Sequence, residues 1–116
     1  MTKVERRTAA RVPARLAMEL TLGGGRTRAE TLNVSANGVY FASTTFIPLL
    51  TKLRITLELP EDGAPSKVTC DGVVVRTEPE VETAGEDDYQ VACYFTDMSE
   101  LDRERLESYI LRHVPF

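Results

Sequence analysis

Residues 16–25 read LAMELTLGGG. Apolar side chains occupy every second position from Leu16 to Leu22, which is the pattern of a β-strand with one buried face. The three glycines that follow favour a hairpin turn, because glycine adopts backbone conformations that other residues avoid. The stretch therefore predicts a strand that turns back into an antiparallel partner at residues 26–34.

The same period of two continues along most of the chain. Asn37-Gly38 is a strong turn signal, and the alternation resumes after it at Val39 and Phe41. Further strands are expected at residues 53–59, 67–77 and 89–95. Turn or loop composition separates them at residues 60–63 and 78–88. Six short strands are predicted in all.

The strand expected at residues 67–77 contains a change in the alternation. Val68 and Cys70 share one parity and Val73 and Val75 share the other, with Gly72 between the pairs. A β-bulge at Gly72 is expected to bring both pairs onto the same face and to bend the strand, as closure of a small barrel requires.

A short amphipathic helix is predicted at the carboxyl end. Ser99 is a candidate N-cap, with Asp102 at the third helical position. The residues that recur at helical spacing are Leu101, Leu106, Tyr109, Ile110 and His113. His113, the only histidine, is interpreted as a residue that caps carbonyls of the last turn, and no catalytic triad can be assembled around it.

With 116 residues and 42% hydrophobic content, the chain is long enough for one compact domain and too short for two. The predicted fold is all-β: a small six-stranded antiparallel β-barrel with a C-terminal α-helix. Closure removes the exposed edges of so short a sheet, and the helix is expected to cap one opening. Residues 16–116 are assigned to the barrel and helix, and residues 1–15 to a flexible basic N-terminal arm.

The net charge of −4 is distributed unevenly along the chain. Residues 1–15 contain five basic residues and one acidic residue, a local excess of +4, so the remaining residues sum to −8. A protein that binds long nucleic acid usually spreads positive charge over a face, because affinity grows with the number of phosphates neutralised. The distribution favours a small anion with two phosphates over a nucleic-acid polymer.

Three arginines lie before Pro13, ahead of the first predicted strand, which begins at Leu16. Pro13 restricts the residue before it to extended geometry and blocks a continuing helix, so the arginines are expected on an irregular lead-in. A guanidinium fork donates parallel hydrogen bonds to phosphate oxygens or to the O6/N7 edge of guanine. The arginines are Arg6, Arg7 and Arg11, and they make the lead-in a candidate nucleotide-binding arm.

A second candidate segment, residues 33–38, lies at the junction between two predicted strands, where loops often carry function. Asn33 offers a side-chain amide and Ser35 a hydroxyl. Gly38 lets the backbone turn tightly or a ligand approach. Tyr40 is close enough in sequence to be a further candidate for lining a pocket there.

The ordered pair of segments resembles the RxxxR and (D/N)xSxxG motifs of PilZ domains. The residues that carry the resemblance are Arg6-Arg7-x-x-x-Arg11 followed by Asn33-x-Ser35-x-x-Gly38. The resemblance extends over the rest of the chain and implies a pocket for the bacterial second messenger cyclic di-GMP. The chain departs from the family pattern at Gln90 and Ala92, where glycines are frequent, and at Asn33, where a carboxylate is commoner.

The resemblance also implies roles for the site residues. It assigns Arg7 and Arg11 to phosphate and to the Hoogsteen edge of guanine, and Arg6 to an auxiliary contact. The polar segment would hydrogen-bond guanine or a phosphate through Asn33 and Ser35. Gly38 would keep the approach of the ligand clear. A basic residue just before the first arginine of the motif often accompanies a stacked pair of ligands, so a two-ligand mode is expected.

The implied function is that of a non-enzymatic receptor whose ligand is cyclic di-GMP, with no cofactor. Binding is expected to order the N-terminal arm and to change a surface read by an unidentified downstream protein partner. Bacterial processes such as motility are implied by the family. Two alternatives stay open: a PilZ-like protein-interaction module for motility or pilus assembly that does not bind cyclic di-GMP, and a small-barrel nucleic-acid binder.

Two further observations bear on location. No apolar run approaches the roughly 18 residues needed to cross a bilayer, and no apolar segment follows the basic N-terminus as in a signal peptide. Cys70 and Cys93 lie in apolar strand patterns without metal-ligand spacing, and are interpreted as small buried thiols in a reducing compartment. The sequence therefore predicts a cytoplasmic protein with no membrane span.

Overall fold

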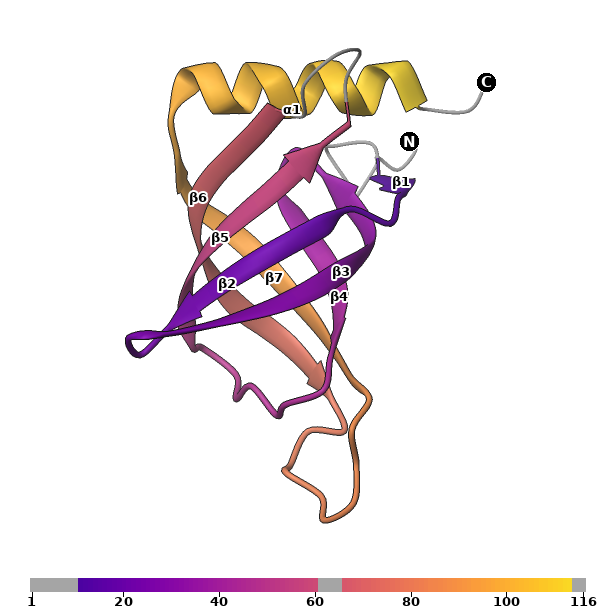
Figure 1. Cartoon of the computed structure of the whole chain (residues 1–116), viewed down its shortest axis with the longest axis vertical. Helices are drawn as coiled ribbons and strands as arrows, with labels where there is room; N and C mark the ends of the chain where they lie inside the picture. The colour runs from indigo at the N-terminus through magenta and orange to yellow at the C-terminus, as the bar shows by residue number, and fades with distance from the viewer. Residues whose placement is uncertain (1–10, 61–65, 114–116) are drawn as a thin grey trace, which may run out of the picture.

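A computed structural model of the chain describes residues 11–60 and 66–113. This part of the chain contains seven strands followed by one helix (Figure 1). In chain order they are β1 (Arg11–Pro13), β2 (Ala17–Leu22), β3 (Gly25–Ser35), β4 (Gly38–Ser43), β5 (Lys52–Leu59), β6 (Ser66–Glu78), β7 (Tyr89–Met98) and α1 (Glu100–His113).

Six of the strands close into an antiparallel barrel. The hydrogen-bonded order is β3-β2-β5-β6-β7-β4, and a further pairing of β4 with β3 completes the ring. β1 is added to β3 outside this ring. The helix α1 lies across one end of the barrel, and the loop between β6 and β7 extends from the other end (Figure 1). The predicted fold class, including the helix that caps one opening, is confirmed.

The barrel interior is filled by the apolar side chains that alternate along each strand. In β2, Met18 and Leu20 are fully buried, whereas Glu19 and Thr21, which alternate with them, are half-buried. The same alternation buries Ile55, Leu57 and Leu59 in β5 and Val91, Cys93 and Phe95 in β7. One-sided burial of each strand is the reason that the period of two in the sequence predicts the strands so closely.

The expected boundary between a flexible arm and the barrel differs from the structure at residues 11–15. Arg11, Val12 and Pro13 form β1 and pair with Ser35, Val34 and Asn33 of β3. The side chain of Val12 is fully buried in the core. Pro13 is compatible with this strand because β1 pairs on one side only, and a proline is tolerated at a sheet edge. The rest of the expected arm, residues 1–10, lies outside the described residues.

β1 and β2 pair one after the other with the same edge of β3. Thr31 of β3 makes hydrogen bonds to the segment that connects them. The buried Thr31 hydroxyl accepts a hydrogen bond from the backbone N–H of Leu16 at 2.8 Å and donates one to the carbonyl of Ala14 at 2.5 Å. Backbone bonds flank it, from Ala14 to the carbonyl of Leu32 and from Thr31 to the carbonyl of Leu16. Thr31 therefore helps to hold β1 in place.

Thr31→Val is expected to lower the free energy of unfolding by about 2 kcal/mol. Valine keeps the shape of the side chain but leaves a buried N–H at Leu16 and a carbonyl at Ala14 without partners. Urea denaturation measures the effect, with Thr31→Ser as the control that keeps the hydroxyl. Equal stability of the valine and serine variants would show that the hydroxyl does not stabilise the segment between β1 and β2.

The predicted β-bulge in β6 is partly wrong. The pairing of β6 with β7 does shift between Asp71 and Gly72, but the extra residue there is Thr96 of β7, and burial in β6 continues in step through Gly72 to Val74. A second shift follows between Val74 and Arg76. Val75 is the extra residue at that shift and is 53% exposed. Contrary to the expectation, Val73 and Val75 therefore do not join Val68 and Cys70 on the core face.

The helix begins as predicted. Ser99 Oγ accepts a hydrogen bond from the backbone N–H of Asp102 at 3.1 Å, and the Asp102 carboxylate accepts one from the backbone N–H of Thr69 in β6. His113 Nδ1 lies 2.8 Å from the carbonyl of Tyr109, in agreement with a capping role. The buried face is made by Leu106, Tyr109 and Ile110. Leu101 is exposed instead, because it lies five residues before Leu106, about 140° around the helix.

Candidate functional site

The turn between β3 and β4 is held by its own serine. Ser35 Oγ accepts hydrogen bonds from the backbone N–H groups of Asn37 at 3.1 Å and Gly38 at 3.2 Å. The Ser35 side chain is 2% exposed. The hydroxyl that the motif assigns to a ligand is therefore also used to shape the turn.

The same turn is fixed to two other elements. The carbonyl of Asn37 accepts a hydrogen bond from the backbone N–H of Phe95 in β7 at 2.8 Å. The carbonyl of Ala36 accepts one from Arg103 Nη1 of α1 at 3.2 Å. The turn is thus tied to both the barrel wall and the helix.

Close packing against β7 requires a glycine at position 38, and the sequence does not reveal this requirement. A Cβ atom at this position would lie 2.4 Å from the carbonyl oxygen of Cys93 in β7. Real Cβ atoms essentially never approach a backbone oxygen so closely. Glycine is therefore required for β4 to pair with β7 at this point, where Gly38 lies opposite Tyr94.

Arg11 and Asn33 are brought into direct contact, one from each predicted segment. Arg11 Nη1 donates a hydrogen bond to Asn33 Oδ1 at 2.5 Å, across 22 residues of sequence. Val12 faces the core, so Arg11 faces outward, in agreement with its exposure. Arg6 and Arg7 lie outside the described residues.

An open hollow of about 310 Å³ surrounds this contact. Its lining residues are Arg11, Asn33, Tyr40, Arg76 and Ala92. The last four form one row across the sheet, because Tyr40 pairs with both Asn33 and Ala92, and Ala92 pairs with Arg76. Ala92 has the smallest side chain of the row and lies between two large ones, so it makes the floor of the hollow.

The walls of the hollow are held by side-chain contacts. The Tyr40 hydroxyl donates a hydrogen bond to Gln90 Oε1 at 2.6 Å, which fixes the ring on one side of Ala92. On the other side, Arg76 Nη2 lies 3.1 Å from Glu78 Oε2, in an exposed ion pair. Guanidinium groups thus approach the hollow from both sides, Arg11 from β1 and Arg76 from β6.

Arg76 is a charged lining residue that the sequence does not predict. It follows three valines in a stretch whose pattern indicates only a strand. Its place in the site depends on the pairing of β6 with β7 and on the extra residue Val75, which sets the register of Arg76 against Ala92. Neither feature can be read from local sequence.

Comparisons with known proteins agree with this architecture. The family model of the PilZ domain matches residues 5–112. The chain belongs to the PilZ domain family. No match was found among curated proteins.

Solved structures resemble the whole barrel. The Bacillus subtilis inhibitor of motility MotI/DgrA has a TM-score of 0.80 and 19% identity, over 96% of this chain and 52% of its own. Apo MrkH of K. pneumonia has a TM-score of 0.73 and 22% identity, over 97% of this chain and 52% of its own. The PilZ domain of YcgR from Escherichia coli with c-di-GMP has a TM-score of 0.68 and 15% identity, over 94% of this chain and 92% of its own. The chain spans about half the length of MotI and MrkH, and at these identities the likeness concerns the fold.

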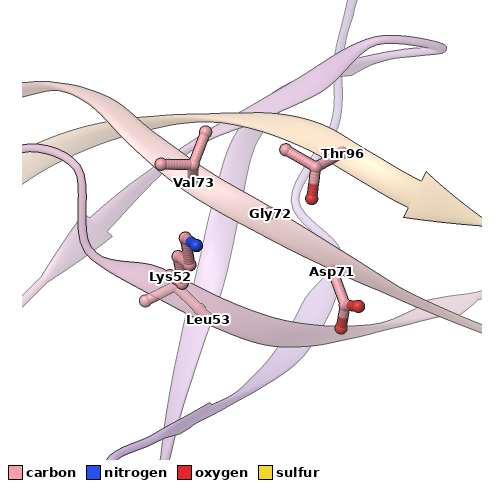
Figure 2. A pocket seen from close by; sticks show the side chains of 6 residues that line it. All are labelled: Lys52, Leu53, Asp71, Gly72, Val73 and Thr96. Atoms are coloured by element: carbon pink, nitrogen blue, oxygen red, sulfur yellow. The ribbon is translucent and has the colours of Figure 1, made fainter.

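A second hollow of this PilZ barrel, of about 470 Å³, lies on the outer face of β5, β6 and β7. Figure 2 shows its lining side chains, among them Lys52, Asp71, Val73 and Thr96. Asp71 is paired with Arg54 at 2.9 Å. None of the PilZ motif residues that the structure describes lines it, and a single lysine beside an aspartate offers less to an anion than two guanidinium groups do.

The described part of the PilZ chain, 11–60 and 66–113, contains no group of three His, Cys, Asp or Glu side chains placed to hold a metal ion. Cys70 and Cys93 are free and buried, as the sequence predicts. Burial raises the pKa of each thiol to about 12, so neither forms a thiolate near neutral pH. No helix among these residues has the length and apolar character needed to cross a membrane.

Proposed function

We propose that the chain is a receptor for cyclic di-GMP and that the ligand binds at the hollow lined by Arg11, Asn33 and Arg76. The observation that carries the proposal is the Arg11–Asn33 contact, which joins the two PilZ motifs at one surface depression. Family membership supports it, as does the structure of the YcgR PilZ domain with c-di-GMP, which this chain resembles over 94% of its length. The K. pneumonia MrkH–c-di-GMP complex is a further similar structure.

The charges around the hollow fit a dinucleotide with two phosphates. Arg11 and Arg76 offer guanidinium forks from opposite sides, and each fork can donate paired hydrogen bonds to a phosphate or to the O6/N7 edge of guanine. Asn33 orients the Arg11 fork by accepting one of its hydrogen bonds. The small side chain of Ala92 leaves room for a planar base between the two walls.

Of the remaining motif residues, two arginines are proposed to contact the ligand, and a serine and a glycine are proposed to support the site. Arg7 is proposed to bind phosphate and the Hoogsteen edge of guanine together with Arg11, as the PilZ motif implies. Arg6 is proposed as an auxiliary contact and as the residue that favours a second ligand molecule. Ser35 and Gly38 act by shaping the turn that supports Asn33 and Tyr40.

The proposed output is a signal to a partner protein. A bound ligand is proposed to act by changing the surface around the hollow, which a partner protein then reads. Motility is the process that fits best, since one similar structure is a Bacillus subtilis inhibitor of motility. Ordering of residues ahead of β1 on binding belongs to the same proposal.

Isothermal titration calorimetry tests the proposal. Cyclic di-GMP is expected to bind, with GTP and a short single-stranded oligonucleotide as comparison ligands that bind far more weakly. Heat released only by the oligonucleotide would favour the small-barrel nucleic-acid binder. No heat with any ligand would favour the PilZ-like protein-interaction module.

Arg76→Ala is expected to weaken cyclic di-GMP binding about tenfold, because it removes one charge-assisted contact to the ligand. The matched control is Arg54→Ala. The two arginines are exposed on neighbouring strands, and each forms an ion pair with a different carboxylate. Arg54 does not line the hollow. Equal losses in the two variants would mean that only net charge matters, and the role of Arg76 would be withdrawn.

A further inference from the structure

A second row of residues crosses the sheet beside the hollow. Successive outward positions of β7 are Ala92 and Tyr94, and the buried Cys93 separates them. Tyr94 pairs with Gly38 of β4 on one side and with Val73 of β6 on the other. Val34 pairs with Val39, so the next positions of β3 and β4, Ser35 and Gly38, lie opposite each other at the turn. Ser35 in turn pairs with Arg11 of β1. Arg11 and Tyr94 therefore lie in the same row.

The surface between Arg11 and Tyr94 carries no projecting side chain. The two intervening positions are Ser35, whose buried hydroxyl is turned into the β3–β4 turn, and Gly38, which has no side chain. Three strand spacings of about 4.8 Å separate β1 from β7, so the bare stretch is about 14 Å long. This bare strip has a guanidinium group at one end and a phenol ring at the other, and it runs alongside Asn33 and Ala92.

Tyr94 is the most exposed of the four tyrosines. Tyr89 and Tyr109 are buried, and Tyr40 is half-buried with its hydroxyl bonded to Gln90. Tyr94 is 53% exposed, and among the described residues its hydroxyl has no hydrogen-bond partner. Two residues before it in β7, Ala92 lines the first hollow, and two residues after it Thr96 lines the second (Figure 2), so Tyr94 lies between the two hollows along β7.

We infer that Tyr94 is a positioning residue that stacks on a purine ring of the ligand and confines it to the bare strip opposite Arg11. This inference rests on the proposed function. A purine has a flat face that an aromatic ring can cover, and such stacking depends little on hydrogen-bond geometry. Arg11 holds the anionic part of the ligand from the other end of the bare strip. The sequence pattern at residues 89–95 predicts a strand and gives no indication of this contact.

Titration calorimetry with cyclic di-GMP on four forms of the full chain tests the inference. Tyr94→Ala is expected to weaken binding about 5- to 20-fold relative to the unmodified chain. Tyr94→Phe keeps the ring and is expected to stay within about threefold. Val81→Ala removes an exposed apolar side chain from the β6–β7 loop at the other end of the barrel and is expected to change nothing.

A second readout separates stacking from a general effect on the fold. In NMR spectra of the unmodified chain, the ring proton signals of Tyr94 are identified by their loss in Tyr94→Phe. They are expected to move upfield when cyclic di-GMP is added, because a stacked purine shields them. This readout also stands alone if the Tm of Tyr94→Ala shows that the alanine variant has lost its fold.

The outcomes distinguish the inference from the proposed function. Absence of cyclic di-GMP binding to the unmodified chain overturns the proposed function and the inference with it. Normal binding by the unmodified chain together with unchanged affinity of Tyr94→Ala overturns the inference alone. Equal losses in Tyr94→Phe and Tyr94→Ala would assign the contact to the hydroxyl and would also overturn stacking.

Discussion

Arg11→Ala is expected to weaken cyclic di-GMP binding about 10- to 100-fold while leaving the Tm of the unliganded protein within about 2 °C. Charge-assisted hydrogen bonds of the size that one guanidinium makes to a phosphate contribute about 1.5–3 kcal/mol, which corresponds to this loss in affinity. Stability changes little, because β1 is held by its backbone pairs with β3 and by the burial of Val12. Calorimetry and thermal denaturation measure the two quantities.

Arg15→Ala is the matched control for this prediction. It removes the same charge four residues further along the chain, from an exposed arginine that is paired with Glu30 at 3.0 Å and does not line the hollow. Its affinity for cyclic di-GMP is expected to stay within about twofold. If Arg15→Ala weakened binding as much as Arg11→Ala, the basic N-terminal region would act through its total charge, and the specific role of Arg11 would be wrong.

The strands of the barrel could be predicted from the sequence because burial is one-sided. In β2, β4, β5 and β7 one face lies in the core, so apolar residues recur with a period of two, as at Met18 and Leu20. The helix is equally legible, since its N-cap at Ser99 and its buried stripe are local features. Local patterns of this kind determine the fold class.

The features that the sequence does not predict depend on pairing between distant residues. Val12 looks like an isolated apolar residue in a basic segment, and only the pairing of β1 with β3 explains its burial. The register between β6 and β7 cannot be predicted from local sequence either, because Thr96 and Val75 are extra residues only with respect to the strand that pairs with them. Arg76 enters the site through that register and therefore escapes detection.

The candidate site itself could be predicted in part. The motif pattern identifies Arg11 and Asn33, which the structure places in contact. For Ser35 and Gly38 the pattern indicates a site but not the role of each residue, because the sequence does not show that one is hydrogen-bonded to the turn and the other packs on Cys93. Both residues support the site from beneath, which makes their substitution a question of stability.

Gly38→Ala is expected to lower the free energy of unfolding of the ligand-free protein by about 3 kcal/mol, and its Tm by about 10 °C or more. The added methyl group would meet the backbone carbonyl oxygen of Cys93, which cannot move without disturbing the pairing of β4 with β7. The backbone conformation of Gly38 is not left-handed, so the whole cost comes from this contact.

Gly25→Ala is the control for Gly38→Ala. Gly25 also has no left-handed conformation, and a Cβ there would lie 3.7 Å from the carbonyl oxygen of Leu22, an ordinary contact distance. Its stability in urea is expected to stay within about 1 kcal/mol of the unmodified chain. If Gly38→Ala were as stable as Gly25→Ala and lost only ligand affinity, the glycine would serve to clear the approach of the ligand. The two measurements therefore decide between a glycine that is required by the barrel and one that is required by the nucleotide.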